Sequence, residues 1–120
     1  MNKTLLIGIR SVEQLEQEAI AAFKSAEAGL PGAEPVHRLY FTDQNTLFSA
    51  LSPKRWELLR FLRNRGPMSI KKLAAELKRD YKNVYDDVKH LSKLDLIQKQ
   101  EDETFYVPWD DITIQLALAA

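Results

Sequence analysis

One short stretch, RDYKNVYDDVKHL from Arg79 to Leu91, combines a helical pattern with a first turn rich in basic, aromatic and amide side chains. Val84, Val88 and Leu91 recur at helical spacing, so the stretch predicts a helix with one buried face. Its opposite face is polar and mixes basic, aromatic and acidic residues. That face carries Lys82, Tyr85, Asp86 and Lys89.

The first turns of this helix suit the reading of bases in the major groove of DNA. Asn83 can bind adenine through two hydrogen bonds, and Lys82 can reach O6 or N7 of guanine. Tyr81 and Tyr85 can touch a thymine methyl group or hydrogen-bond a phosphate. Either tyrosine can instead be a half-buried packing residue, and this alternative stays open.

A second set of basic residues suits phosphate oxygens, because most of them lie near predicted helix N-termini. The set consists of Arg79, Lys54, Arg55, Lys71 and Lys72, with Lys89 on the reading helix and Lys99 in a following hairpin. Each of them can equally be solvated surface. Asp86 and Asp87 repel phosphate, so they should turn away from the DNA backbone, or Asp86 serves to reject wrong bases.

Charge is segregated along the chain although the formal net charge is zero. Residues 53–95 hold 12 Lys and Arg against 6 Asp and Glu, a balance of +6, and the remaining residues have a balance of −6. One part of the molecule should therefore carry a positive field that overall neutrality hides, which is typical of a nucleic-acid binder.

Three short helices should position these side chains. Ser52-Pro53 predicts the start of the first, which ends at Gly66-Pro67. Ser69 should cap the second, over 70–78, and Asp80 should cap the third. A tight turn joins the second and third helices, which is the layout of a helix-turn-helix. LIQKQ and TFYVP then predict a β-hairpin around Glu101-Asp102-Glu103, closed by Pro108.

The two ends of the chain predict strands and one more helix. TLLIGIR at 4–10 and VHRLYFT at 36–42 predict strands, separated by a helix from a Ser11 capping box to Gly29 and by the loop GLPGAEP. The apolar stripe of this predicted helix consists of Val12, Leu15, Ala19, Ala22 and Ala26. Asp43 should cap a short helix. ITIQLAL predicts a last strand with one buried face.

Residues 52–108 resemble the winged helix-turn-helix of small prokaryotic transcription regulators of the MarR and ArsR kind. The resemblance rests on SPKRWELLRFL, GPMSIKKLAAEL and DYKNVYDDVKHLSKLDLI. It implies an α+β fold in which a winged helix-turn-helix gains an N-terminal strand-helix-strand and a C-terminal strand. The expected regions are 1–51 for dimerisation or partner binding, 52–108 for DNA and 109–120 for the last strand.

A narrower resemblance spans nearly the whole chain. TLLIGIRS, LSPKRWELLR, RDYKNV and VPWDDI look like a family of short archaeal and bacterial DNA-binding proteins, often described as the antitoxin or regulator of toxin–antitoxin pairs. The resemblance implies operon autoregulation and a cognate toxin as a partner.

The sequence departs from the regulator pattern at two places. Asp95 stands where such regulators usually have glycine before the wing strand, a left-handed position that aspartate tolerates less well. The tip of the wing is Glu101-Asp102-Glu103, where a wing that holds DNA would carry Arg or Lys. We therefore expect the wing to matter more for packing than for binding phosphates.

Several other classes of protein fit the sequence poorly. There are no cysteines, and His37 and His90 lack a second ligand at metal spacing, so we expect no metal and no cofactor. No glycine-rich phosphate loop or nucleophile–base arrangement is visible, which favours a protein that is not an enzyme. No apolar run approaches the roughly 18 residues of a membrane span, and we expect a cytoplasmic protein.

Two expectations concern partners. A half-site read by one helix is short, so specificity favours a homodimer with recognition helices about 34 Å apart. The strands and the helix over 11–28 should supply the dimer or partner surface. The alternative function is a winged-helix adaptor that binds proteins without direct contact to double-stranded DNA, and the acidic wing tip favours it.

Overall fold

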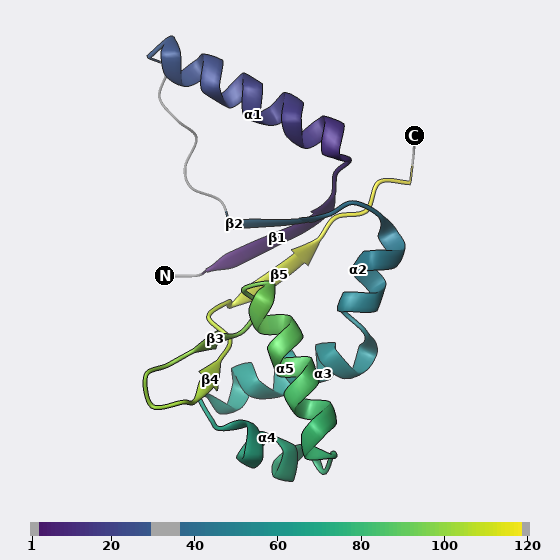
Figure 1. Cartoon of the computed structure of the whole chain (residues 1–120), viewed down its shortest axis with the longest axis vertical. Helices are drawn as coiled ribbons and strands as arrows, with labels where there is room; N and C mark the ends of the chain where they lie inside the picture. Colours follow the sequence, from purple (N-terminus) through teal and green to yellow (C-terminus); the bar gives the residue numbers. More distant parts are fainter. Residues whose placement is uncertain (1–2, 30–36, 119–120) are drawn as a thin grey trace. The chain divides into compact units, whose positions relative to one another are not determined.

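The computed structural model describes residues 3–29 and 37–118. The chain divides into two compact units, one built mainly from residues 48–111 and the other from residues 4–47 and 112–120. The described residues form five helices and five short strands, in one three-stranded and one two-stranded sheet. The predicted mixture of helices and strands is therefore confirmed (Figure 1).

The larger sheet has the strand order β2-β1-β5. β1 (Thr4–Ile9) and β2 (His37–Phe41) run parallel, with Leu5 opposite His37 and Ile9 opposite Phe41. Both strands were predicted. The start of the second, Val36, and the loop after Gly29 lie outside the described residues.

The last strand is shorter than predicted. β5 comprises Asp111–Ile114, and the backbone N–H of Gln115 donates to the Ile7 carbonyl at 2.9 Å. Strand structure ends there, and Leu116 and Leu118 are exposed. The prediction of a strand through Leu118 with one buried face is therefore wrong: the strand ends at Ile114, which is itself 39% exposed, and no residue of β5 is buried.

The helix α1 (Val12–Glu27) begins as predicted, with a capping box between Ser11 and Gln14. The Ser11 hydroxyl accepts from the Gln14 backbone N–H at 3.1 Å, and the Gln14 amide oxygen accepts from the Ser11 N–H at 2.8 Å. No residue of α1 is buried, and Phe23 is 65% exposed. The apolar stripe of this helix is therefore uncovered in the described part of the chain.

The short helix α2 (Gln44–Ala50) confirms the predicted role of Asp43. The Asp43 carboxylate accepts hydrogen bonds from the backbone N–H and the hydroxyl of Thr46, at 2.7 and 2.9 Å. These two bonds, the backbone bond first, hold the pKa of Asp43 below its ordinary value.

Three further helices follow at the predicted places, α3 (Pro53–Arg65), α4 (Ile70–Leu77) and α5 (Tyr81–Lys93). The hydroxyls of Ser52 and Ser69 cap α3 and α4 as expected. Asp80 occupies the N-cap position of α5 but makes no side-chain capping hydrogen bond, so that part of the prediction is wrong.

The three helices share an apolar core. Each contributes side chains at helical spacing, and most of them are completely buried. The core includes Leu58, Leu62, Leu73, Val84, Val88, Leu91, Leu96 and Ile97. Because Val84, Val88 and Leu91 all point inward, the remaining faces of α5 must point outward.

The predicted hairpin is present, with strands shorter than the sequence indicated. β3 (Gln98–Lys99) and β4 (Phe105–Tyr106) pair antiparallel. Met68 exchanges two backbone hydrogen bonds with Phe105, at 3.1 and 2.9 Å, which joins the hairpin to the start of α4. The buried Trp109 donates from Nε1 to the Asp95 carbonyl at 3.0 Å and joins the end of the hairpin to the end of α5.

A first prediction concerns Asp95, whose φ of +60° is the left-handed conformation that the sequence indicated. Asp95→Gly should raise the free energy of unfolding by up to about 1 kcal/mol, because glycine adopts this conformation without strain. Asp95→Val should lower the free energy of unfolding by about 1 kcal/mol or more. Urea unfolding measures both, and a glycine variant less stable than the valine variant would contradict the prediction.

Candidate nucleic-acid interface

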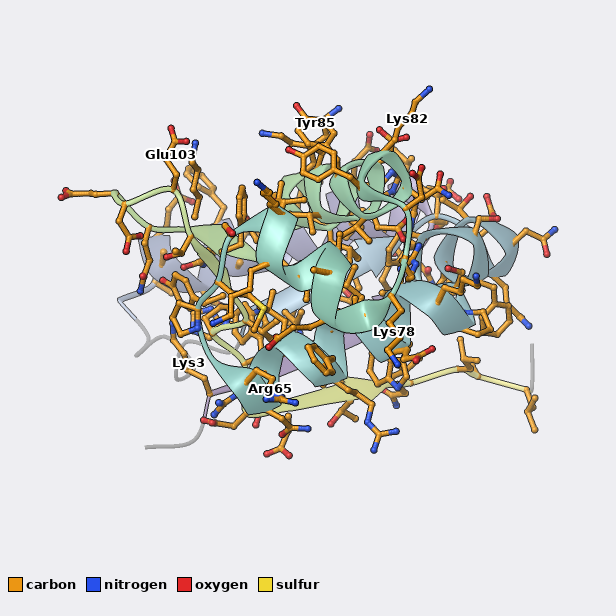
Figure 2. The ribbon with its side chains drawn as sticks, turned by 90° about the horizontal axis from the view of Figure 1, so that it is seen from below. Lys3, Arg65, Lys78, Lys82, Tyr85 and Glu103 are labelled. Atoms are coloured by element: carbon orange, nitrogen blue, oxygen red, sulfur yellow. The ribbon has the colours of Figure 1, made fainter. Side chains whose placement is uncertain are left out.

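The outward face of α5 carries the predicted base-reading residues. Lys82, Asn83 and Lys89 are exposed, and Tyr81 and Tyr85 are 52% and 40% exposed. Figure 2 shows Lys82 and Tyr85 projecting outward from the same helix. Both tyrosines are partly covered, so the alternative in which they are half-buried packing residues stays open, and all five side chains are accessible to solvent.

The aromatic side chains of this surface are ordered by contacts with each other and with a lysine. The rings of Tyr81 and Tyr85 lie 6.2 Å apart, centroid to centroid, at 31°. The Lys89 ammonium lies 5.3 Å from the Tyr85 ring and 5.9 Å from that of Phe105. Cation–π contacts at exposed sites are weak, about 0.5–1 kcal/mol, so they favour an arrangement without locking it.

Asp87 binds two of the arginines that the sequence assigned to phosphates. One carboxylate oxygen accepts from Arg55 Nε at 2.9 Å and the other from Arg79 Nη2 at 2.7 Å. The side chains of all three residues are no more than 20% exposed. Asp87 does turn inward, as predicted, but the reason is a pair of internal ion pairs. Arg55 and Arg79 are therefore partly neutralised.

The arginine cluster borders an open hollow of about 860 Å³. Its walls come from the first turn of α3, the turn between α4 and α5, and the first turns of α5. The lining residues are Ser49, Ser52, Pro53, Lys54, Arg55, Lys78, Arg79, Asp80, Asn83, Asp86 and Asp87. The N-termini of two helices border this hollow, and helix N-termini carry partial positive charge. An anion such as a phosphate suits these surroundings, although Asp80 and Asp86 oppose it.

Lys78 is a basic residue of this hollow that the sequence reasoning missed. It ends α4 in a left-handed conformation, with φ 56° and ψ 45°, and its side chain is exposed. The sequence signal was available, because Lys78 is a basic residue at the end of the second predicted helix, next to Arg79 and the predicted cap Asp80.

A second, smaller hollow of about 290 Å³ lies between α5, the start of α4 and the hairpin. It brings together Lys71, Tyr81, Tyr85, Lys89 and Lys99 with Asp102 and Glu103. Lys72 lies beside Lys71 in the first turn of α4 and is exposed. The sequence assigned these lysines to phosphates separately, and three of them, Lys71, Lys89 and Lys99, line this hollow together.

The tip of the hairpin places acidic groups next to this surface. Glu101, Asp102 and Glu103 are all exposed, and Glu103 projects toward the same side as Tyr85 and Lys82 (Figure 2). The Lys99 ammonium lies 3.7 Å from the Glu103 carboxylate, so part of its charge is offset. The Thr104 hydroxyl and backbone N–H lower the pKa of Asp102, which keeps this carboxyl ionised.

No group of three or more His, Cys, Asp or Glu residues that could hold a metal ion occurs among the described residues. In the same residues, no helix is long and apolar enough to cross a membrane.

Asp110, at the end of the larger unit, accepts from the backbone N–H of Lys3 and from Arg63, and these contacts lower its pKa. This carboxyl has a structural role and lies outside the surface described above.

Comparison with known proteins identifies a family. The model of the HVO_A0114 family matches residues 50–114, more than half of the 120-residue chain. The chain belongs to this family, and the match includes α3, α4, α5 and the hairpin. No curated protein and no solved structure matches the chain.

A second prediction tests the arginine cluster. Asp87→Asn should lower the free energy of unfolding by roughly 1–3 kcal/mol, because it removes the charge that compensates two largely buried guanidinium groups. Chemical denaturation measures the change. Asp86→Asn is the matched control, since that side chain is exposed, and it should change stability by less than about 0.5 kcal/mol. Equal effects would show that the two ion pairs add no stability.

A third prediction concerns His90, whose pKa lies below its ordinary value of 6.5 because of desolvation first and then the cations Arg55 and Lys93. The unfolded chain therefore binds this proton more tightly, and the contribution of His90 to stability is lost as pH falls below 6.5. Arg55→Ala should raise the pKa of His90 in an NMR titration. Arg60→Ala, on the same helix, should leave it unchanged, and the opposite pattern would contradict this account.

Proposed function

We propose that residues 52–108 form a winged helix-turn-helix that binds double-stranded DNA, and that the protein is a sequence-specific transcriptional regulator. The observation that carries the proposal is the outward face of α5. Tyr81, Lys82, Asn83, Tyr85 and Lys89 are all exposed, and the other side of the same helix is fixed in the core. An exposed helix with this chemistry suits the major groove.

In this proposal, the side chains of the first two turns of α5 contact the edges of the bases. The amide of Asn83 offers adenine one donor and one acceptor, and Lys82 offers guanine a donor. Tyr81 and Tyr85 present apolar ring edges to thymine methyl groups, and each hydroxyl can reach a phosphate. Asp86 is exposed beside them and disfavours phosphate on its side of the helix.

In this proposal, residues that border the two hollows bind the phosphates of the DNA backbone. Lys54 and Lys78 border the larger hollow, and Lys71 borders the smaller one. Arg79 adds a donor, because its Nη1 has no hydrogen-bond partner among the described residues. This nitrogen is buried, so a phosphate in the larger hollow could accept from it only if the Arg79 side chain moved.

The wing has a smaller role in this proposal than in regulators with basic wings. Three acidic residues at its tip would repel the DNA backbone, and Lys99 is already close to Glu103. Its contacts with Met68, and that of Trp109 with Asp95, stabilise the positions of α4 and α5. The wing therefore acts through packing, as the sequence indicated.

The resemblance of the sequence to antitoxins extends the proposal. We propose a cytoplasmic homodimer that regulates its own operon and has a cognate toxin as partner. The alternative is an adaptor that uses the same fold to bind protein. The acidic wing tip and the partly neutralised arginines favour the alternative, and salt dependence separates the two.

The fourth prediction tests the reading surface. Fluorescence anisotropy with DNA of the protein's own promoter, beside a scrambled duplex, should show preferential binding that weakens steeply as salt rises. Lys82→Ala and Asn83→Ala should each cost roughly 1–3 kcal/mol of specific binding. Asn64→Ala, an exposed asparagine on α3, is the matched control and should have no effect.

The outcomes distinguish the two candidate functions. Unchanged affinity of the Lys82 and Asn83 variants, in a protein that does prefer its promoter, would show that another face reads the bases. Absence of binding to either duplex at low salt would reject the DNA proposal and favour the adaptor. Circular dichroism of each variant shows whether its fold is intact.

A further inference from the structure

We propose that Glu103, at the tip of the hairpin, limits the affinity of the interface for DNA by pairing with Lys99 in the place of a phosphate. A phosphate of the DNA backbone can then reach Lys99 only by displacing this carboxylate. This role rests on the proposed function, because it concerns how strongly the same surface binds the DNA backbone. It makes Glu103 a residue that sets affinity, which is more specific than general repulsion of DNA by an acidic wing.

The Lys99 ammonium borders the smaller hollow and contacts both a carboxylate and an aromatic ring. It lies 3.7 Å from the Glu103 carboxylate and 6.0 Å from the centre of the Phe105 ring. Lys71 and Lys89 border the same hollow, and neither forms an ion pair with another of the described residues. Of these three lysines, Lys99 is therefore the one whose charge is offset within the described part of the chain.

The backbone of the turn holds Glu103 beside Lys99 in a strained conformation. Its φ of 64° lies in the left-handed region, which glycine adopts without strain and glutamate adopts rarely. Its N–H donates to the Gln100 carbonyl at 3.1 Å, which fixes the turn at this position. The Glu103 side chain is 82% exposed and so adds nothing to the core. Strain at an exposed residue that does not pack points to a functional role for its side chain.

The other two acids of the tip are placed differently. The Asp102 carboxylate also borders the hollow, but it accepts from the hydroxyl of Thr104 at 2.6 Å and from its N–H at 3.2 Å, which keeps it within the turn. Glu101 is exposed, lies outside the lining of the hollow, and has no ion pair with another described residue. Glu103 is therefore the tip carboxylate that is paired with Lys99, and Glu101 offers a matched control.

DNA bound on α5 would bring phosphates close to this pair. Tyr85 of α5 borders the same hollow as Lys99, and Glu103 projects toward the same side as Tyr85 (Figure 2). A carboxylate and a phosphate compete for one ammonium, because both accept charge-assisted hydrogen bonds. An exposed ion pair is weak, so this competition should lower affinity by about two- to fivefold without abolishing binding. Phosphate contacts carry no sequence information, so every duplex should be affected by the same factor.

Fluorescence anisotropy at fixed low salt, with the promoter duplex and a scrambled duplex, tests this role. Glu103→Gln should raise the affinity for both duplexes about two- to fivefold beyond the effect of Glu101→Gln, which removes the same charge from the same tip. In a Lys99→Ala background the two glutamine variants should have equal effects, because the ammonium that Glu103 occupies is gone. Equal effects with Lys99 present would overturn the proposal. An excess that persists without Lys99 would also overturn it, because Glu103 would then act by repelling DNA directly.

Failure of this role and failure of the proposed function give different results. Promoter preference in the wild-type chain, with equal effects of the two glutamine variants, would overturn the role of Glu103 and leave the regulator standing. An excess effect of Glu103→Gln on both duplexes, without promoter preference, would support the role and overturn sequence-specific regulation. Absence of binding by the wild-type chain and by both variants would overturn the two proposals together.

Discussion

The burial of one side of α5 is the constraint on which the candidate interface depends. Val84, Val88 and Leu91 are completely buried, and a helix with 3.6 residues per turn then has only one direction in which its other residues can point. With those three residues fixed in the core, Lys82, Asn83 and Tyr85 lie on the opposite side of the helix and are exposed. Asp87 adds a second constraint, since its ion pairs with Arg55 and Arg79 connect α5 to α3 and to the turn before α5.

This arrangement affects how cations are distributed over the interface. Arg55 and Arg79 lie close to Asp87, whereas Lys54 and Lys78 remain exposed beside them in the larger hollow. Lys71 is exposed at the smaller hollow. A lysine is a flexible, strongly hydrated charge that suits a phosphate without demanding a particular geometry. The arginines thus stabilise the positions of the helices, while the lysines are available to a ligand. The hairpin also has a packing part and a solvent-exposed part. Phe105 bonds to Met68 and Trp109 to Asp95, whereas the acidic tip remains in solvent.

Features that depend on a few neighbouring residues were predictable from the sequence. Ser11, Ser52 and Ser69 mark helix starts because a cap involves residues only three positions away. The left-handed conformation of Asp95 was instead implied by the resemblance to regulators that have glycine at this position. The order of the three helices and the hairpin followed from these signals together with the apolar periodicity.

Features that depend on distant contacts could not be predicted in this way. Arg55 and Asp87 are 32 residues apart, so nothing in the local pattern showed that the arginine has an internal partner. The alternation in ITIQLAL indicated a longer strand than β5, because sequence alternation does not show where a partner strand ends. The capping role of Asp80 failed because a suitable residue type does not ensure the hydrogen bond. The hollow that includes Lys78 depends on three separate segments coming together.

The segregation of charge separates the region of α3, α4 and α5 from the N-terminal helix α1. The basic residues are concentrated in α3, α4 and α5, whereas α1 carries four glutamates and one lysine. An acidic helix competes poorly for phosphate, so nucleic acid is a poor occupant of its exposed apolar face. Overall neutrality thus conceals a basic region and an acidic helix, and it does not argue against the proposed binding of DNA.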